Sequence, residues 1–137
     1  MINEFLNLPW PRIVLLFGFF YLLLLLFAWV YADRILFPAP PSANYTKEEV
    51  DFYVPISDAL QIACIKIESS KPSGLTVLYS HGNAEDLGNV RSHLSSLSEF
   101  GCDFVSYDYP GYGLSQGVSS EDGCNLAIEA VFRYLVT

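Results

Sequence analysis

Basic side chains are scarce in this sequence. It has 7 Lys and Arg residues against 15 Asp and Glu residues, so the formal net charge is −8. Residues 1–34 are neutral, since two acidic residues balance two arginines, and the negative charge therefore lies in residues 35–137. An acidic domain repels the phosphates of nucleic acids and the headgroups of anionic lipids. The composition therefore argues against nucleic acid as a partner.

Cysteine and histidine are also few. The three cysteines, Cys64, Cys102 and Cys124, form no Cys-x-x-Cys motif. Neither a metal site nor a disulfide framework is expected, and the cysteines are predicted to be small buried hydrophobic residues. Of the two histidines, His93 lies among serines on a predicted helix and is expected at the surface. The sequence implies no metal and no cofactor.

Charge is absent from residues 13–31, which form a continuous apolar run. A helix of this length measures about 28 Å, close to the hydrocarbon thickness of a bilayer, and it shows no polar face that would suit a core helix. We therefore expect a single-pass transmembrane helix or uncleaved signal anchor, with the lipid bilayer as partner. A cleavable signal peptide is the competing interpretation, although its apolar region is usually shorter. The few flanking charges leave the membrane orientation open.

The chain is long enough for one small domain. Residues 1–37 are predicted to form the membrane anchor, residues 38–49 a proline-rich spacer and residues 50–137 the folded domain. The spacer contains three prolines near its start, and proline stiffens the backbone and donates no hydrogen bond. Asn44 opens an Asn-Tyr-Thr glycosylation sequon, which has meaning only if this segment faces a eukaryotic lumen.

Strand patterns recur along the domain. Residues 51–55 and 60–68 are rich in β-forming residues and flank a turn at residues 57–59, which predicts a hairpin. Residues 75–80 and 102–109 are two further predicted strands, and the first of them is apolar enough to be buried on both faces of a sheet.

A helix is expected after each of these last two strands. The first has Val90, Leu94 and Leu97 on one face and Gly101 as its C-terminal cap. The second is capped by Ser119 or Ser120, and its apolar face is predicted to consist of Ala127, Ala130, Val131, Tyr134 and Leu135. This order of elements predicts an α/β fold with right-handed crossovers and a parallel sheet.

A His-Gly-Asn sequence follows the predicted strand 75–80. Gly82 removes side-chain bulk, and the turn before the next helix directs main-chain N–H groups into open space, where they can stabilise an oxyanion during acyl transfer. The donor is expected to be the N–H of Asn83, with Ala84 as the alternative. His81 is expected to form hydrogen bonds within the loop. A general base or metal ligand is the competing interpretation, but no acidic or cysteine partner lies at ligand spacing.

Residues 113–117 match Gly-x-Ser-x-Gly, the signature of a serine-hydrolase nucleophile. A nucleophile elbow needs a strand that runs directly into this sequence and a helix that starts directly after it. Here residues 110–112 lie between the predicted strand and the Gly-x-Ser-x-Gly sequence, and residues 117–118 lie between Ser115 and the start of the next predicted helix. Ser115 is therefore predicted to be a structural loop residue, with a nucleophile as the alternative. A phosphate-binding loop around Gly111 is a third interpretation, which the absence of Gly-x-Gly-x-x-Gly spacing disfavours.

Both motifs together, separated by one helix and one strand, resemble the α/β-hydrolase superfamily. The second motif is Asp-x-x-Gly-x-Gly-x-Ser, in which Asp108, Gly111, Gly113 and Ser115 occupy the named positions. With the apolar N-terminus and the proline-rich spacer, the chain is similar to membrane-anchored α/β-hydrolase-domain proteins related to serine aminopeptidases and acyl-thioesterases. The resemblance covers about residues 50–137.

The resemblance implies the N-terminal half of an α/β-hydrolase domain. In such a domain the loop with Asn83 and Ala84 contributes to the oxyanion hole, and Ser115 belongs to the loop after the fourth strand. The nucleophile elbow, the acidic residue and the catalytic histidine would follow Thr137 in that order.

The function implied is hydrolysis of an ester, thioester or amide bond in a small-molecule, acyl or peptide substrate by a serine nucleophile. Residues 1–137, as a truncated chain without the triad, are expected to be inactive alone. The alternative is a non-catalytic membrane-anchored remnant or interaction module.

Overall fold

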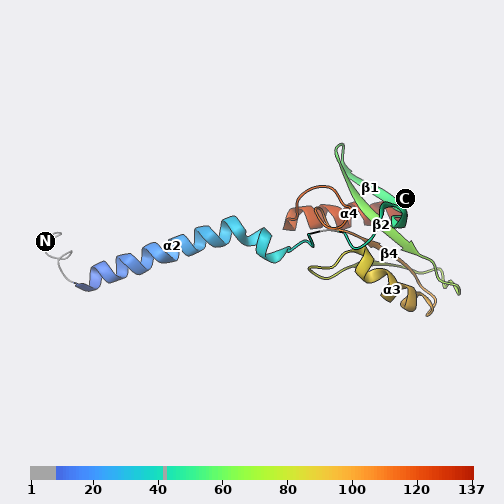
Figure 1. Cartoon of the computed structure of the whole chain (residues 1–137), viewed down its shortest axis with the longest axis horizontal. Helices are drawn as coiled ribbons and strands as arrows, with labels where there is room; N and C mark the ends of the chain where they lie inside the picture. Colours follow the sequence, from blue (N-terminus) through green and yellow to red (C-terminus); the bar gives the residue numbers. More distant parts are fainter. Residues whose placement is uncertain (1–8, 42) are drawn as a thin grey trace. The chain divides into compact units, whose positions relative to one another are not determined.

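The computed structural model describes residues 9–41 and 43–137, and the chain divides into two units between Ile35 and Leu36. The first unit contains most of the helix α2, and the second is a mixed α/β domain (Figure 1). The domain confirms the predicted fold class.

Helix α2, Pro9–Leu36, contains the predicted apolar run and extends beyond it at both ends. Pro11 lies near its start, where the missing N–H of proline removes no hydrogen bond within the helix. Arg34 lies in the last turn, where its positive charge interacts favourably with the helix dipole. The side chains of residues 13–31 are all exposed, and the helix is long and apolar enough to cross a membrane. Residues 1–8 of the predicted anchor lie outside the described residues.

Four strands form a mixed sheet in the order β1-β2-β4-β3. The strands are β1 (Phe52–Ser57), β2 (Leu60–Ile67), β3 (Thr76–Ser80) and β4 (Asp103–Tyr107). Strands β1 and β2 pair antiparallel, which confirms the predicted hairpin, and β2 also pairs antiparallel with β4. Strands β3 and β4 are the one parallel pair among the described residues, so the prediction of a parallel sheet is correct for that pair alone.

Strand β1 continues past Pro55, where the sequence predicted its end. Proline is tolerated there because β1 is an edge strand of the described sheet, so a missing N–H removes no ladder hydrogen bond on its outer side. The register between β1 and β2 is irregular between Pro55 and Ser57.

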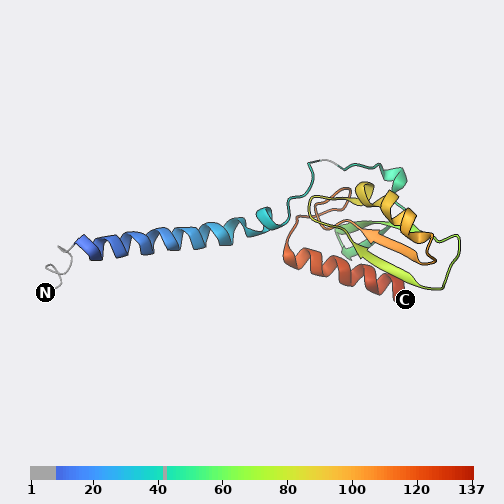
Figure 2. The ribbon, with the colours of Figure 1, turned by 90° about the horizontal axis from the view of Figure 1, so that it is seen from below.

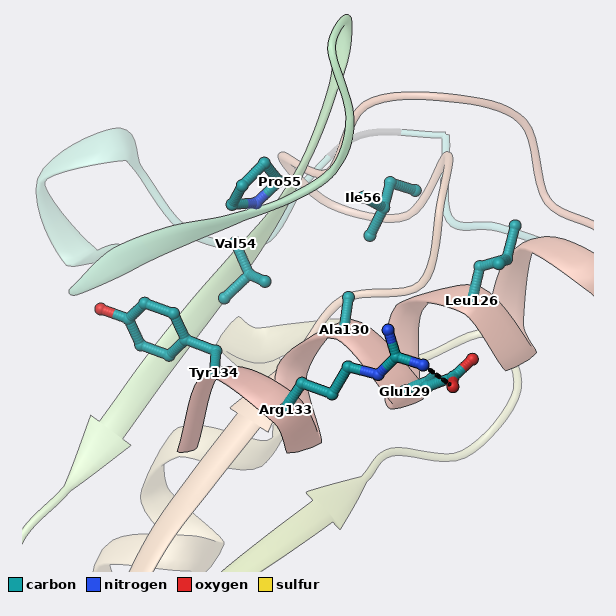
Figure 3. Close-up of a pocket in the computed structure, with 8 residues that line it drawn as sticks. All are labelled: Val54, Pro55, Ile56, Leu126, Glu129, Ala130, Arg133 and Tyr134. Carbon is teal, nitrogen blue, oxygen red and sulfur yellow. Dashed lines mark hydrogen bonds and ion pairs between the residues drawn. The ribbon is translucent and has the colours of Figure 1, made fainter. Parts of the chain in front are cut away.

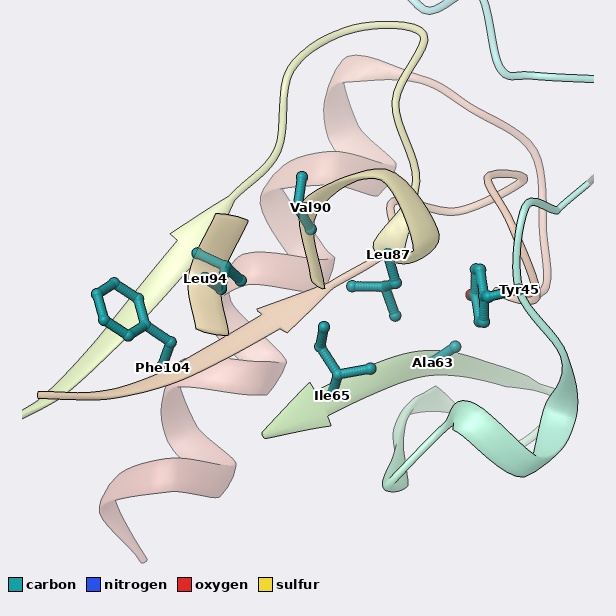
Figure 4. Packing of buried hydrophobic residues seen from close by; sticks show 7 residues of the cluster. All are labelled: Tyr45, Ala63, Ile65, Leu87, Val90, Leu94 and Phe104. Atoms are coloured by element: carbon teal, nitrogen blue, oxygen red, sulfur yellow. The ribbon is translucent and has the colours of Figure 1, made fainter. Parts of the chain in front are cut away.

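Helix α3, Leu87–Ser98, covers one face of the sheet, and helix α4, Glu121–Val136, covers the other (Figure 2). Alternate residues of β2 contact the two helices, because successive side chains of a strand point to opposite faces. The cluster under α3 is drawn in Figure 4 and consists of Tyr45, Ala63, Ile65, Leu87, Val90, Leu94 and Phe104. The cluster under α4 consists of Val54, Ile62, Cys64, Val105, Tyr107, Ala127 and Val131.

Side-chain caps fix where both helices begin. The Asp86 carboxylate accepts a hydrogen bond from the N–H of Asn89 at the start of α3. The Ser120 hydroxyl accepts the N–H of Gly123 at the start of α4, so Ser120 is the cap of the two candidates that the sequence offered. Gly101 lies just beyond the end of α3 with φ of +104°, the left-handed conformation expected at a helix C-terminus.

The prediction that residues 75–80 are buried on both faces is wrong. Leu75 is 63% exposed and Val77 is 38% exposed. The reason is that β3, like β1, is an edge strand of the described sheet, with β4 as its single neighbour. The predicted apolar face of α4 is correct for Ala127 and Val131, which are buried, and for Ala130 and Leu135, which are half-buried against the same cluster, but Tyr134 is 51% exposed. Four more apolar residues of this helix are also exposed: Leu126, Ile128, Phe132 and Val136.

Candidate functional site

The loop that follows β3 begins at a buried histidine. The imidazole Nδ1 of His81 lies 3.0 Å from the carbonyl oxygen of Gly82, and the carbonyl of His81 accepts a hydrogen bond of 2.7 Å from the hydroxyl of Tyr109. The rings of Tyr109 and Tyr112 lie 4.4 Å and 5.7 Å from the imidazole, centroid to centroid. His81 is therefore fixed on both its ring and its main chain.

The other imidazole nitrogen of His81 points at a buried carboxylate. Nε2 lies 3.2 Å from Oδ1 of Asp108, and both side chains are completely buried. The two atoms are not aligned as a hydrogen bond. No group of three His, Cys, Asp or Glu side chains that could bind a metal occurs in residues 9–41 and 43–137, and His93 is exposed on α3.

Residues 82–85 form a tight, exposed turn. The N–H of Glu85 donates to the carbonyl of Gly82 at 3.3 Å, and the Glu85 carboxylate accepts the N–H of Gly82 at 2.8 Å. Ala84 has φ of +62°, a left-handed conformation that a residue with a Cβ adopts at a cost. A Cβ on Gly82 would meet only the end of the Glu85 side chain. The turn is thus fixed by its own hydrogen bonds.

Two consecutive N–H groups of this turn are available. Within the described part of the chain, the N–H groups of Asn83 and Ala84 form no hydrogen bond, and both residues are exposed. Helix α3 starts directly after the turn, so the positive end of its dipole lies close by. The arrangement suits a developing negative charge.

Asp108 is fully buried in the domain, and its carboxylate binds groups on both sides of this turn. Its Oδ1 accepts the N–H of Leu87 at 3.0 Å, and its Oδ2 accepts a short hydrogen bond from the hydroxyl of Tyr45. A Cβ on Gly113 would come within 1.9 Å of the same Oδ2. Glycine at position 113 therefore permits the close approach of the loop main chain to the carboxylate.

Ser115 directs its hydroxyl to main-chain groups. Its Oγ accepts the N–H of Ala63 in β2 at 2.9 Å and donates to the carbonyl of Asp108 at 2.9 Å. Ser115 is buried, and among the described residues no hydrogen bond joins it to either histidine. The next residue, Gln116, extends the contact with β2 through two hydrogen bonds to Gln61.

The glycine loop uses its own main-chain donors. The N–H groups of Tyr112, Leu114 and Ser115 all donate to other protein atoms. Gly111 has φ of +78°, and a Cβ there would lie 3.0 Å from the Ser119 hydroxyl. Few N–H groups remain for a bound phosphate, so the geometry favours a packed loop over a phosphate cradle.

The buried thiol of Cys64 is not suited to act as a nucleophile. Burial raises the pKa of the Cys64 thiol to about 12, so this thiol stays protonated and is a poor nucleophile. Cys102 and Cys124 are partly buried, and no disulfide occurs within the described part of the chain.

The grooves of the domain lie elsewhere. A groove of about 340 Å³ lies between β1 and α4, and Arg133 and Glu129 on its rim are paired at 2.5 Å. Figure 3 shows the residues that line it. A second groove of about 450 Å³ lies between the end of α4 and strands β3 and β4. Neither groove is lined by the turn at residues 82–85.

Two residues at this site were not identified from the sequence. Tyr45 and Asn44 belong to the predicted spacer, yet they bind Asp108 and Asp86 respectively. Their partners lie 63 and 42 positions further along the chain. A tyrosine in a polar segment is the one signal in the sequence that could have indicated such a contact.

Sequence comparison relates the chain to a group of hydrolase-fold proteins. Alpha/beta hydrolase domain-containing protein 17B of Homo sapiens is 39% identical over 99 residues, which are 69% of this chain and 34% of that protein. Alpha/beta hydrolase domain-containing protein aho-3 of Caenorhabditis elegans is 43% identical over 76 residues, or 55% of this chain and 23% of that protein. The chain spans about a third of the length of the curated relatives it matches. No family model matches it.

Solved structures show the same fold. A probable hydrolytic enzyme from Pseudomonas aeruginosa PAO1 superposes on this chain with a TM-score of 0.56 at 18% identity. The match covers 71% of this chain and 35% of the enzyme. The esterase Pf2001 from Pyrococcus furiosus gives a TM-score of 0.53 at 19% identity, over 71% of this chain and 42% of that chain. At these identities the likeness concerns the fold alone.

Proposed function

Since this chain has the fold of the α/β-hydrolase superfamily and is similar in sequence to α/β-hydrolase domain-containing proteins, we propose that it forms the oxyanion side of a serine-hydrolase site. The reaction is hydrolysis of an ester, thioester or amide bond in a small-molecule, acyl or peptide substrate. The observation that supports the proposal most strongly is that the N–H groups of Asn83 and Ala84 form no hydrogen bond within the described residues. They lie on a turn that is held by hydrogen bonds between Gly82 and Glu85.

These N–H groups would bind the oxygen that becomes negative in the tetrahedral intermediate. Donors that are already oriented stabilise this charge without reorganising, and loss of one such donor typically slows hydrolysis by about 10²–10³-fold. The positive end of the α3 dipole would add to the stabilisation. In the superfamily the second donor is the N–H that follows the nucleophile. The turn thus provides the donor on its own side, the N–H of Asn83 or, as the alternative, that of Ala84, and the second donor would come from outside the described residues.

The nucleophile is assigned to no residue of this chain. The hydroxyl of Ser115 already makes two main-chain hydrogen bonds and is buried. We assign Ser115 a structural role, in which it joins the loop 108–117 to β2. His81, Gly82, Asp108, Gly111 and Gly113 are assigned structural roles in the same frame. A serine nucleophile, an acidic residue and a catalytic histidine must come from outside the residues described.

Helix α2 is proposed to anchor the protein in a bilayer. Its length, the mean hydropathy of 2.8 in its 18-residue apolar window and the exposure of residues 13–31 suit a lipid environment. The partners are then the bilayer through α2 and the substrate through the domain.

The prediction that tests this assignment concerns residues 1–137 alone. The purified chain in detergent micelles is expected to hydrolyse p-nitrophenyl acetate no faster than its Ser115→Ala variant or a buffer blank, because no activated nucleophile is present. Release of p-nitrophenolate is followed by absorbance. Turnover that disappears in Ser115→Ala would show that Ser115 is a nucleophile and would refute the assignment.

One observation favours a second candidate function, that of an interaction module. Leu126, Phe132 and Val136 of α4 and Leu75 before β3 are exposed apolar side chains of one small domain, and such surfaces often bind other proteins. The reading frame of the transcript distinguishes the hydrolase from the interaction module. A reading frame that continues into a Gly-x-Ser-x-Gly elbow supports the hydrolase, whereas a frame without any elbow supports the module.

A further inference from the structure

The segment at residues 43–46 connects α2 to the domain and contacts the frame of the proposed site. Tyr45 is only 7% exposed and belongs to the hydrophobic cluster under α3, where its ring lies close to Ala63 and Leu87 (Figure 4). A flexible spacer would leave such a side chain in solvent. This segment is instead packed on the domain.

The hydroxyl of Tyr45 joins two parts of the site. It donates to Oδ2 of Asp108 and accepts the N–H of Leu114 at 3.0 Å. Burial, with the Asp108 carboxylate next to it, raises the pKa of the Tyr45 phenol well above its usual value, so the phenol stays protonated and remains a donor. The opposite oxygen of Asp108 accepts the N–H of Leu87, the first residue of α3. Tyr45 thus holds the Asp108 carboxylate in place, and that carboxylate in turn holds Leu87, which follows the turn.

Asn44 binds the last residue of the same loop. Its main-chain N–H donates to Oδ2 of Asp86 at 2.7 Å, and its side-chain Nδ2 lies 3.2 Å from the same oxygen and 3.4 Å from Oδ1 of Asn89. Asp86 is fully buried and caps α3. The fit is close, since a Cβ on Gly88 would come within 2.7 Å of the Asn44 carbonyl oxygen.

We propose that Tyr45 and Asn44 are positioning residues for the turn that presents the N–H groups of Asn83 and Ala84. The proposal rests on the proposed function, because it assigns these residues to the oxyanion side of that site. Asp108 lies beside His81, which precedes the turn, and accepts the N–H of Leu87, the first residue of α3. Asp86, to which Asn44 donates, directly follows the turn. The segment that leads from the membrane helix therefore contacts both carboxylates that determine the geometry of the turn.

Amide hydrogen exchange on the whole chain in detergent micelles tests this inference. Tyr45→Phe keeps the ring in the cluster and removes only the hydroxyl. Loss of one buried hydrogen bond corresponds to about a tenfold change in a local opening equilibrium. We therefore expect exchange at Leu87 and Leu114 to rise about tenfold, with little change in β2 and β4. Tyr53→Phe is the matched control, because Tyr53 lies on β1 and is 37% exposed, and it is expected to change nothing.

A rise confined to Leu87, Leu114 and the hydrogen-bonded amides of the turn, Gly82 and Glu85, supports the proposal. Unchanged exchange at these amides, or an equal rise throughout the sheet, overturns it, because the first result denies the coupling and the second shows a general loss of stability. If Tyr45→Phe does not fold, Asn44→Ala is measured instead, with the same local rise expected at residues 86–89. The measurement needs no substrate, so a chain that shows the local effect but hydrolyses p-nitrophenyl acetate through Ser115 refutes the proposed function and not the coupling.

Discussion

Replacement of Asp108 by alanine is expected to lower the free energy of unfolding of the domain by about 2–6 kcal/mol. The carboxylate is fully buried and accepts from two buried donors, the Tyr45 hydroxyl and the Leu87 N–H. Each donor left without a partner costs about 1–3 kcal/mol. Small domains have only about 5–15 kcal/mol of total stability, so the variant is expected to be largely or partly unfolded at low urea concentrations.

Urea unfolding of the whole chain in micelles, followed by far-ultraviolet circular dichroism, measures this effect. Tryptophan fluorescence is unsuitable, because Trp10 and Trp29 both lie in α2. Asp108→Asn keeps one carbonyl oxygen as an acceptor and is expected to cost less than the alanine variant. Asp58→Ala, in the exposed turn between β1 and β2, is the control and is expected to change stability by less than about 0.5 kcal/mol. An Asp108→Ala variant as stable as this control would contradict the central place given to the carboxylate.

The second large effect is expected for Gly113→Ala. The new Cβ would lie 1.9 Å from Oδ2 of Asp108 and 2.7 Å from the hydroxyl of Tyr45, and φ is +49°. The left-handed conformation costs alanine about 1–2 kcal/mol, and displacement of the carboxylate adds about 1–3 kcal/mol for the disrupted hydrogen bond. We expect a total loss of about 2–5 kcal/mol in the free energy of unfolding, measured as for Asp108.

Gly74→Ala is a matched control for Gly113→Ala. Gly74 also has a left-handed conformation, with φ of +81°, but a Cβ there would meet no atom within 4 Å. Its loss of stability is therefore expected to reflect backbone strain alone, about 1–2 kcal/mol. Equal losses in the two variants would mean that the loop can move away from Asp108 without cost, and that the packing around the carboxylate is loose.

Local sequence patterns were sufficient for most of the elements. The apolar run predicted α2, the alternation in residues 60–68 predicted β2, and Ser120 and Gly101 lie at the helix ends where caps were expected. These features depend on interactions between residues close in the chain, such as the bond from Gly123 to Ser120. Patterns of this kind are visible without a fold.

Long-range contacts were not predictable in the same way. Nothing near Tyr45 in the sequence indicates a bond to Asp108, 63 positions away. The exposure of Val77 follows from the place of β3 at the edge of the described sheet, and an apolar run cannot show how many neighbours its strand will have. The second apolar side of α4, with Leu126 and Phe132, was missed for a related reason, since helical periodicity cannot show which of two apolar faces meets the sheet.

The Gly-x-Ser-x-Gly sequence shows that the spacing of a motif does not by itself identify a nucleophile. Its spacing equals that of a nucleophile elbow, yet the serine follows β4 by eight residues and bonds back to β2 and to Asp108. The proposed oxyanion turn has a much less distinctive sequence, His-Gly-Asn-Ala, but Ala84 has the strained φ and Asn83 the available N–H. Main-chain geometry, which the sequence does not display, is what distinguishes the two loops.

Reaction with a fluorophosphonate, which forms a covalent adduct with activated serines, tests the central claim most directly. That claim is that the chain provides an oxyanion turn and a structural serine, but no nucleophile. Intact mass measurement of the chain after incubation is expected to show no adduct, because the Ser115 hydroxyl is buried and bonded to Ala63 and Asp108. An adduct mapped to Ser115 by peptide mass spectrometry would contradict the account.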